Sequence, residues 1–253
     1  MFVFKHYSLA LLRWVITGLC CVMALTMRAQ FSDSVHHNIG FGATGIINST
    51  NSNSSFVVNN AIRYNINKKN RYFNSNAAWI YGRQNGRQTN NDFTAAMDYN
   101  VYGWAPHWYY WGLLTFEKSF SLKINSRSQG GAGLGYTLSE KKEANIVLSN
   151  GLLYEYSNLK IDSVNNDSYS TIRNSFRLKY HFVFAQVITL DGVHFWQQSL
   201  SSGEDYIIKS SSSLSVKIKK WLSLSTALTY NKVNRTDSRN LLFTIGLSAD
   251  YYF

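Results

Sequence analysis

The sequence predicts an all-β fold, a closed antiparallel transmembrane β-barrel of about twelve strands. Apolar residues alternate with polar ones in segment after segment, and a period of two indicates strands whose two faces meet different surroundings. Aromatic residues make up 15% of the 253 residues and charged residues only 15%, with a single proline, which favours pleated strands over helices or disorder. The expected strands are even in number, so both ends of the chain lie on the same side of the barrel.

The first residues predict a secretory signal. A basic front ending at Arg13 precedes the apolar run 14–25. We expect residues 1–29 to be a cleaved signal peptide and residues 30–253 to be the barrel domain, with an uncleaved anchor helix as the alternative. Both cysteines lie in the signal, so the mature chain has no thiol chemistry, and its net charge falls from +11 to +8.

The barrel strands follow one another from residue 36 onward. Each is about ten to fourteen residues long, close to what a tilted strand needs to cross a bilayer. The expected strands are 36–47, 55–67, 71–83, 92–103, 107–118, 127–138, 145–157, 169–182, 184–197, 205–218, 221–231 and 241–253. The connections alternate between long and short, as in 158–168 against 68–70. We therefore expect the short turns on the periplasmic side, as in outer-membrane barrels.

The last strand shows the alternation most clearly. Odd-numbered residues of 241–253 are apolar, whereas most even-numbered ones are small or polar. The chain ends in Phe253, which with Tyr251 resembles the terminal signal that the barrel assembly machinery recognises. We expect a protein of the Gram-negative outer membrane, with the lipid bilayer, lipopolysaccharide and that machinery as its partners. The sequence leaves the oligomeric state open.

The inward faces of the expected strands collect charges of both signs. Buried charges need partners, so we expect salt bridges such as Glu117 with Arg127, and Glu155 with an arginine of the next strand. Two interpretations stay open: a narrow, slightly anion-favouring pore, and a packed polar interior that only holds the barrel round. The expected lumen charges are Arg63, Asp98, Glu117, Arg127, Glu155, Arg173, Arg177, Lys179, Asp191 and Asp250.

Three glycines at every second position of one expected strand indicate close packing. They are Gly131, Gly133 and Gly135, and they lack the spacing of a dinucleotide-binding loop. All three point the same way, so they would relieve crowding inside the barrel against the bulky Tyr109 and Trp111 of a neighbouring strand.

No residue pattern predicts an enzyme, a metal site or a cofactor. Adjacent His36 and His37 point to opposite faces of a strand. Among the alternatives, a lipid hydrolase on a twelve-stranded barrel would need a lipid-facing base, and His194 is the only plausible one. A secreted soluble β-protein is the other alternative. No basic run exceeds two residues, which argues against nucleic-acid binding.

Four short stretches resemble a known family. They are Tyr81–Arg83, Phe116–Phe120, Gly131–Tyr136 and Ser170–Arg177, and their order and spacing are similar to those of the domain-of-unknown-function 481 family, the salt-induced outer-membrane-protein group. The resemblance covers about 36–253, nearly the whole mature chain. It implies an outer-membrane barrel whose molecular activity is largely undefined, an envelope-structural protein or a small pore.

Overall fold

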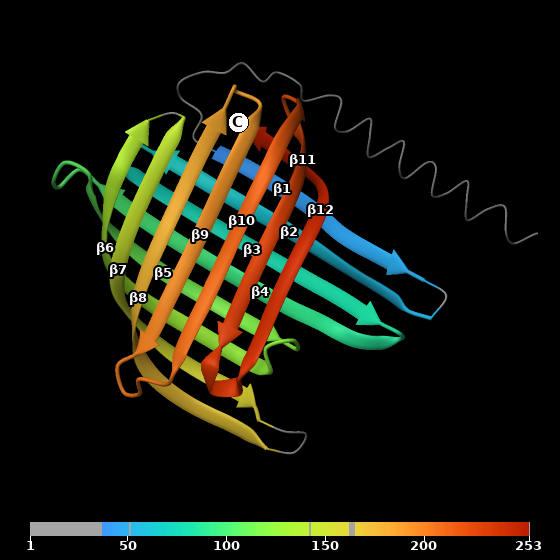
Figure 1. Ribbon diagram of the computed structural model, residues 1–253. Coiled ribbons are helices and arrows are strands. Elements are labelled where there is room, and N and C mark those ends of the chain that lie inside the picture. Colours follow the sequence, from blue (N-terminus) through green and yellow to red (C-terminus); the bar gives the residue numbers. More distant parts are fainter. Residues whose placement is uncertain (1–36, 51, 142, 162–164, 253) are drawn as a thin grey trace, which may run out of the picture. The chain divides into compact units, whose positions relative to one another are not determined.

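The computed structural model describes residues 37–50, 52–141, 143–161 and 165–252, and they form a closed barrel of twelve antiparallel strands (Figure 1). The predicted signal peptide and Phe253 lie outside the described residues. The strands are β1 (His37–Ser49), β2 (Ser54–Lys68), β3 (Arg71–Gln84), β4 (Arg87–Tyr102), β5 (Trp108–Ser119), β6 (Ile124–Lys141), β7 (Ala144–Lys160), β8 (Asn166–Phe184), β9 (Ile188–Ser199), β10 (Tyr206–Lys219), β11 (Leu222–Val233) and β12 (Ser238–Tyr252). A short 3-10 helix, η1 (Asn234–Thr236), precedes β12.

The predicted alternation is confirmed: most exposed large apolar side chains lie on the outward faces of the strands. Phe243, Ile245 and Leu247 on β12 are about half exposed, and so are Leu114 and Phe116 on β5. A ring of exposed apolar side chains around a closed barrel is the surface that lipid solvates. No described helix is long and apolar enough to cross a membrane.

Several predicted loops are strands instead. The expected loop 84–91 is a two-residue turn, in which Asn85 and Gly86 both have positive φ, 49° and 76°. An Asn-Gly pair favours this tight hairpin turn, whose twist matches that of the strands it joins. The long polar loop expected over 158–168 is also shortened, because β7 and β8 continue past the membrane-length segment. Their backbone ladder needs no apolar side chains beyond the lipid.

The barrel closes where β1 meets β12, and this seam is short. β1 pairs with β2 over thirteen residues. It pairs with β12 over only eight, Asn38–Gly45 against Ile245–Tyr252. Beyond Gly45 the β1–β2 hairpin diverges from β12, as Figure 1 shows. The first half of β12 therefore has a strand neighbour on one side only, β11.

Candidate functional site

The barrel interior holds a buried network of ion pairs on the wall formed by β5 to β8. Glu155, Arg127 and Arg173 are fully buried. Arg127 Nη1 lies 3.2 Å from Glu117 Oε2, and its Nε lies 3.5 Å from Glu155 Oε1. Arg173 Nε lies 2.8 Å from Glu155 Oε2, and its Nη2 lies 2.8 Å from Asp205 Oδ1. Both expected ion pairs are thus present, in one continuous network.

Neutral side chains complete this network. The Tyr169 hydroxyl donates to Glu155 Oε1 at 2.7 Å. Gln129 Nε2 donates to Glu155 Oε2 at 2.6 Å and to Gln197 Oε1 at 2.8 Å. Lys209 reaches across from β10, with Nζ 2.7 Å from Glu117 Oε2. Charges buried with partners of opposite sign and with hydrogen bonds are tolerated, so this wall is a packed core and not the lining of a channel.

A second group of charges lies apart from the first. Arg177 Nη1 lies 2.6 Å from Asp98 Oδ2, and the guanidinium carbon lies 5.3 Å from the ring centroid of Trp111 and 5.8 Å from that of Phe195. Lys179 Nζ lies 4.0 Å from the same Asp98 oxygen. These groups fill the same half of the barrel as the larger network, because β4 to β9 carry nearly all the bulky inward side chains.

The remaining predicted lumen charges form two separate pairs. Arg63 is paired with Asp250 across the seam strands, and the Arg63 side chain is 52% exposed. Asp191 Oδ1 lies 2.6 Å from His181 Nδ1. The ten predicted charges therefore lie in separate clusters along the wall and do not form a ring around a pore.

The three glycines lie where bulky neighbours leave no room for a side chain. A Cβ on Gly135 would lie 2.1 Å from the Tyr109 ring, and one on Gly133 would lie 2.7 Å from Trp111. A Cβ on Gly131 would lie 2.0 Å from a backbone oxygen of β7. Tyr109 and Trp111 pair directly with Gly135 and Gly133 across β5 and β6. The glycines thus let the aromatic rings lie flat against β6.

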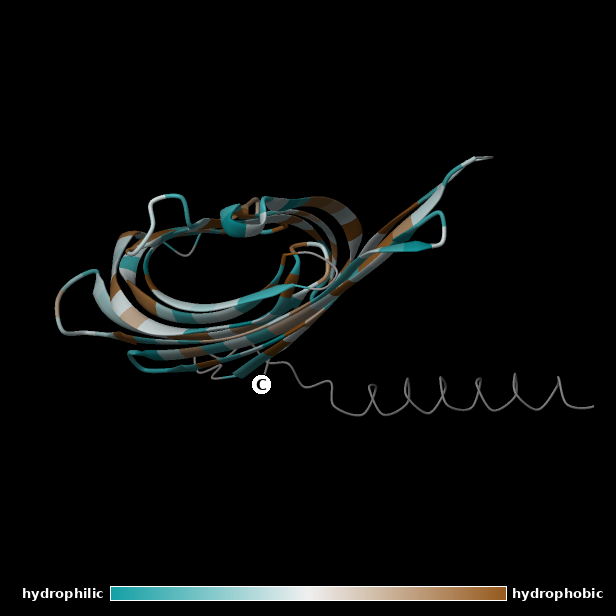
Figure 2. Cartoon of the chain, turned by 90° about the horizontal axis from the view of Figure 1, so that it is seen from below, coloured by the Kyte–Doolittle hydropathy of each residue, from teal (hydrophilic) through white to brown (hydrophobic). Residues whose placement is uncertain are grey.

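The opposite wall, from β10 through β12 and β1 to β3, presents small inward side chains. Ala61, Asn76 and Ser211 point inward and are nevertheless exposed. Figure 2 shows the ring of strands from the barrel end. Because inward residues stay solvent-accessible only where no side chain covers them, this half of the lumen is open beside Ala61, Asn76 and Ser211. The other small inward residues of this wall include Ser213, Ser215, Ser223, Ser225, Ala227, Thr229, Ser248, Gly42 and Ala78.

A bridge crosses the barrel mouth at the end opposite His37 and Tyr252. The turn between β5 and β6 folds inward, where the Ser121 hydroxyl donates to Asp92 Oδ2 at 2.7 Å and accepts from Asn240 Nδ2 at 3.0 Å. The Thr236 hydroxyl donates to the Leu122 carbonyl at 3.2 Å. β4 and β12 are thereby connected across the lumen. The sequence prediction missed this bridge because a turn has no alternating pattern to show that it folds inward.

Two further acidic residues of the site were not predicted. Asp92 lies in the first half of β4 and Asp205 directly precedes β10. Each is the first residue of an expected strand, where the alternating pattern fades. Both are buried, with 6% and 4% of their surface exposed. In the sequence Asp92 follows Asn90 and Asn91, and Asp205 follows Glu204. Such polar stretches are too common to single either residue out.

His194 lies on the outer face, as the hydrolase alternative requires. Its Nδ1 lies 2.7 Å from Ser210 Oγ on β10, and the ring stacks on Tyr180 with centroids 5.4 Å apart. The Tyr180 hydroxyl in turn lies 3.0 Å from Ser212 Oγ. Within the described residues, no carboxylate or amide contacts Nε2 of this histidine, and no group of three or more His, Cys, Asp or Glu could hold a metal ion.

Comparisons with known proteins agree on the fold. The NanC porin is similar in structure, with a TM-score of 0.50 and 8% identity over 86% of this chain and 99% of that one. The translocator domain of the autotransporter NalP from Neisseria meningitidis has a TM-score of 0.47 and 11% identity, over 98% of both chains. An outer membrane channel from Pseudomonas putida F1 has a TM-score of 0.48 and 10% identity, over 88% of this chain and 97% of that one.

The fold is thus that of outer-membrane barrels. No curated protein matches the sequence. The family model described as "Protein of unknown function, DUF481" matches residues 39–251, which is nearly the whole barrel. The chain therefore belongs to the DUF481 family of proteins of unknown function.

Proposed function

We propose that this chain is a narrow diffusion channel of the Gram-negative outer membrane, without enzymatic activity. The observation that carries the proposal is the unequal filling of the lumen. Twelve strands enclose more space than eight, whose interior side chains fill, and less than the sixteen of an aqueous porin. Here one wall is packed with paired charges, whereas inward Ala61, Asn76 and Ser211 remain exposed. Water and small solutes would pass along that second wall.

The same asymmetry bears on ion selectivity. Arg173 and Arg177 are buried and paired, so they would not face a passing ion. Exposed inward cations on the open side would set any preference. Lys217 points inward near the end of β10 and is exposed, and the side chain of the inward Arg63 on β2 is 52% exposed. Their sign supports a weak preference for anions.

Conductance in planar bilayers tests this proposal. We expect small discrete steps from the refolded protein, and smaller steps from Ser211→Trp, because the indole would project into the open half. The matched control is Leu214→Trp on the same strand, which points toward lipid and should leave the conductance unchanged. Silence from protein whose insertion is verified, or equal steps from both variants, would reject the channel.

Lipid hydrolysis is the second candidate function, favoured by the 2.7 Å contact between His194 and Ser210 on the lipid-facing surface. A serine nucleophile needs a base that is itself oriented by a third group, and oxyanion donors beside it. Nε2 of His194 has no acid or amide partner in the described part of the chain, and the backbone donors around Ser210 are engaged in the sheet. We therefore rank this function below the channel.

Export and assembly complete the proposal. The basic and apolar segments of residues 1–29 support export through a signal peptide. Tyr251 points outward at the end of β12 and is 45% exposed, which suits a lipid-facing terminal strand read by the assembly machinery. Lipopolysaccharide would contact the outer face of the barrel at the end opposite Tyr251. Pulse-chase detection of a precursor about three kilodaltons heavier than the mature chain would test the first point.

A further inference from the structure

We infer that the seam between β1 and β12 is a lateral portal, through which a single-chain amphiphile passes between the lumen and the surrounding lipid. This inference rests on the open half-lumen of the proposed channel. Its first support is the register. The ladder between the two strands ends at the pair Gly45 and Ile245, although β1 continues to Ser49 and β12 begins at Ser238.

The free edge of β12 needs water or a ligand. Backbone N–H and C=O groups on one side of its first half have no strand partner. Sheet edges open to lipid do not occur in the hydrocarbon region, whereas unpaired backbone is tolerated where it lines a water-filled cavity. The edge therefore faces a hydrated opening that is continuous with the lumen.

The bridge across the mouth obstructs the axial route, so a molecule in the lumen would leave through this opening. Ser121 and Leu122 connect β4 with the turn before β12 and so obstruct the barrel axis at this end. The space that remains is bounded by the bridge, by β12 and by β1 to β4. Its unbridged side is the gap between β1 and β12.

The lining of the gap is apolar on both faces, which is unusual for this barrel. Inward positions on the open wall are otherwise small or polar, but Ile46 and Leu242 point inward beside the gap, and Val57 and Ile80 follow on β2 and β3. Ile46 is 48% exposed. On the outer face, Ile47 is 81% exposed and is the most exposed large apolar side chain described. An apolar chain could thus move across the gap without leaving apolar contact.

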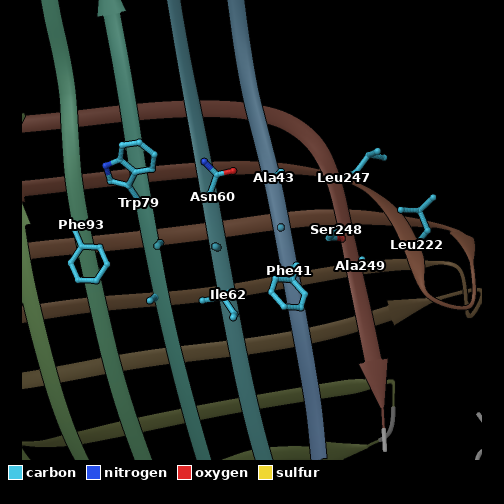
Figure 3. A pocket seen from close by; sticks show the side chains of 14 residues that line it. Phe41, Ala43, Asn60, Ile62, Trp79, Phe93, Leu222, Leu247, Ser248 and Ala249 are labelled. Atoms are coloured by element: carbon cyan, nitrogen blue, oxygen red, sulfur yellow. The ribbon is translucent and has the colours of Figure 1, made fainter. Parts of the chain in front are cut away.

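A groove on the outer face lies over the closed part of the same seam and fits an amphiphile. Its cavity of about 540 Å³ extends over β11, β12 and β1 to β4, with small Ala43 in its floor and Trp79 at its wall. Figure 3 shows Asn60 between these two residues. In the described structure no side chain hydrogen-bonds the exposed Asn60 amide. An amide within an apolar, lipid-facing groove offers a hydrogen bond to a polar head group, while the alkyl chain lies against the apolar walls.

Fluorescence quenching in lipid vesicles tests the portal. A bimane label is attached through single cysteines, which residues 30–253 otherwise lack. The quencher is 12-doxylstearic acid, itself a single-chain amphiphile. We expect strong quenching at the lipid-facing position of Leu241→Cys, none at the buried inward position of Ser225→Cys, and quenching at the inward Leu242→Cys close to that at Leu241→Cys. A Leu242→Cys label as protected as the Ser225→Cys label would overturn the inference.

Spin labels check that the gap is open. If the ladder simply continued, Ile47 would face Phe243, just as Ala43 faces Leu247 in the closed stretch. The pair Ala43→Cys and Leu247→Cys should show dipolar broadening, whereas Ile47→Cys with Phe243→Cys should not. Equal broadening would mean a closed seam. Disulfide-linked dimers at Ile47→Cys would mean that a second copy covers the edge, which also overturns the portal.

Failure of the portal and failure of the channel give different results. Iodide is a water-soluble quencher, so it should reach a bimane at Ser211→Cys if the half-lumen is open. Iodide quenching and conductance without doxyl quenching at Leu242→Cys would leave the channel intact and reject only the portal. Loss of both iodide quenching and conductance would reject the channel itself. Heat-modifiable gel migration verifies the folding of every variant.

Discussion

Replacement of Arg173 by methionine should destabilise the barrel more than any exposed charge does. Arg173 is fully buried and donates to both Glu155 oxygens, at 2.8 and 3.0 Å, to the Asp205 carboxylate and carbonyl, at 2.8 and 3.0 Å, and to the Tyr169 hydroxyl at 3.1 Å. Methionine fills much of the volume but leaves two buried carboxylates without this partner. Removing one member of a buried ion pair costs about 3–5 kcal/mol.

The remaining contacts place the effect at the lower end of that range. Glu155 keeps Arg127 at 3.5 Å, and Asp205 keeps Arg235 at 3.7 Å. We therefore expect a loss of about 3 kcal/mol in the free energy of unfolding, or about two orders of magnitude in the folding equilibrium constant. Conductance of the folded variant should be unchanged, because Arg173 lines no open space.

Equilibrium unfolding by guanidinium in lipid vesicles measures this loss. The matched control is Arg63→Met, which breaks the ion pair with Asp250. The Arg63 side chain is 52% exposed, so about 1 kcal/mol or less should be lost. Equal losses in the two variants would refute the argument that the network of Arg173 is a core. A clear fall in conductance with Arg173→Met would refute its assignment to the packed half.

Three further predictions follow from the structure. Gly135→Ala places a Cβ against the Tyr109 ring and should lower the free energy of unfolding by about 1–3 kcal/mol. In the control Gly42→Ala, the new Cβ meets no atom within 4 Å, so this variant should unfold at nearly the wild-type denaturant concentration. Equal unfolding midpoints of the two variants would contradict the packing argument. Ser210→Ala should leave ester hydrolysis in mixed micelles at the wild-type background, and an activity lost with the hydroxyl would establish the hydrolase instead. Deletion of Phe253 should reduce membrane insertion in cells, measured as heat-modifiable protein in the outer membrane fraction; normal insertion would show that the terminal residue is not read.

The outward half of this structure could be predicted from the sequence because lipid favours apolar side chains. Most outward residues of a spanning strand are apolar, so the alternation in segments such as 241–253 reveals the strand. The strand ends could not be predicted in the same way. Outside the lipid the ladder is held by backbone hydrogen bonds and by polar side chains such as Asn85, so Asn-rich or Ser-rich segments such as 84–91 can form strands as well as apolar ones do.

For the interior, the sequence could predict which side chains point inward, but only some of the contacts between them. Period two decides that Glu117 and Arg127 point inward, and their adjacent strands bring them together. It does not decide contacts between distant strands, such as Lys209 with Glu117, since these depend on the stagger and flattening of the closed barrel. The period-two pattern also does not decide how deeply an inward side chain is buried. This burial distinguishes the packed wall from the open one.

The short seam and the packed wall have a common physical origin. A barrel of this size stays closed if each strand pairs fully with both neighbours, or if its interior holds the strands in place. Here the ion pairs from Glu117 to Asp205 fix the curvature of β5 to β9 from inside. The bridge through Ser121 then anchors β12 to β4 across the lumen. Because β12 is held from within, its pairing with β1 can end after eight residues without opening the barrel. A side opening is thus compatible with stability here, and Arg173→Met should increase the mobility of spin labels at the seam as well as lower the unfolding free energy.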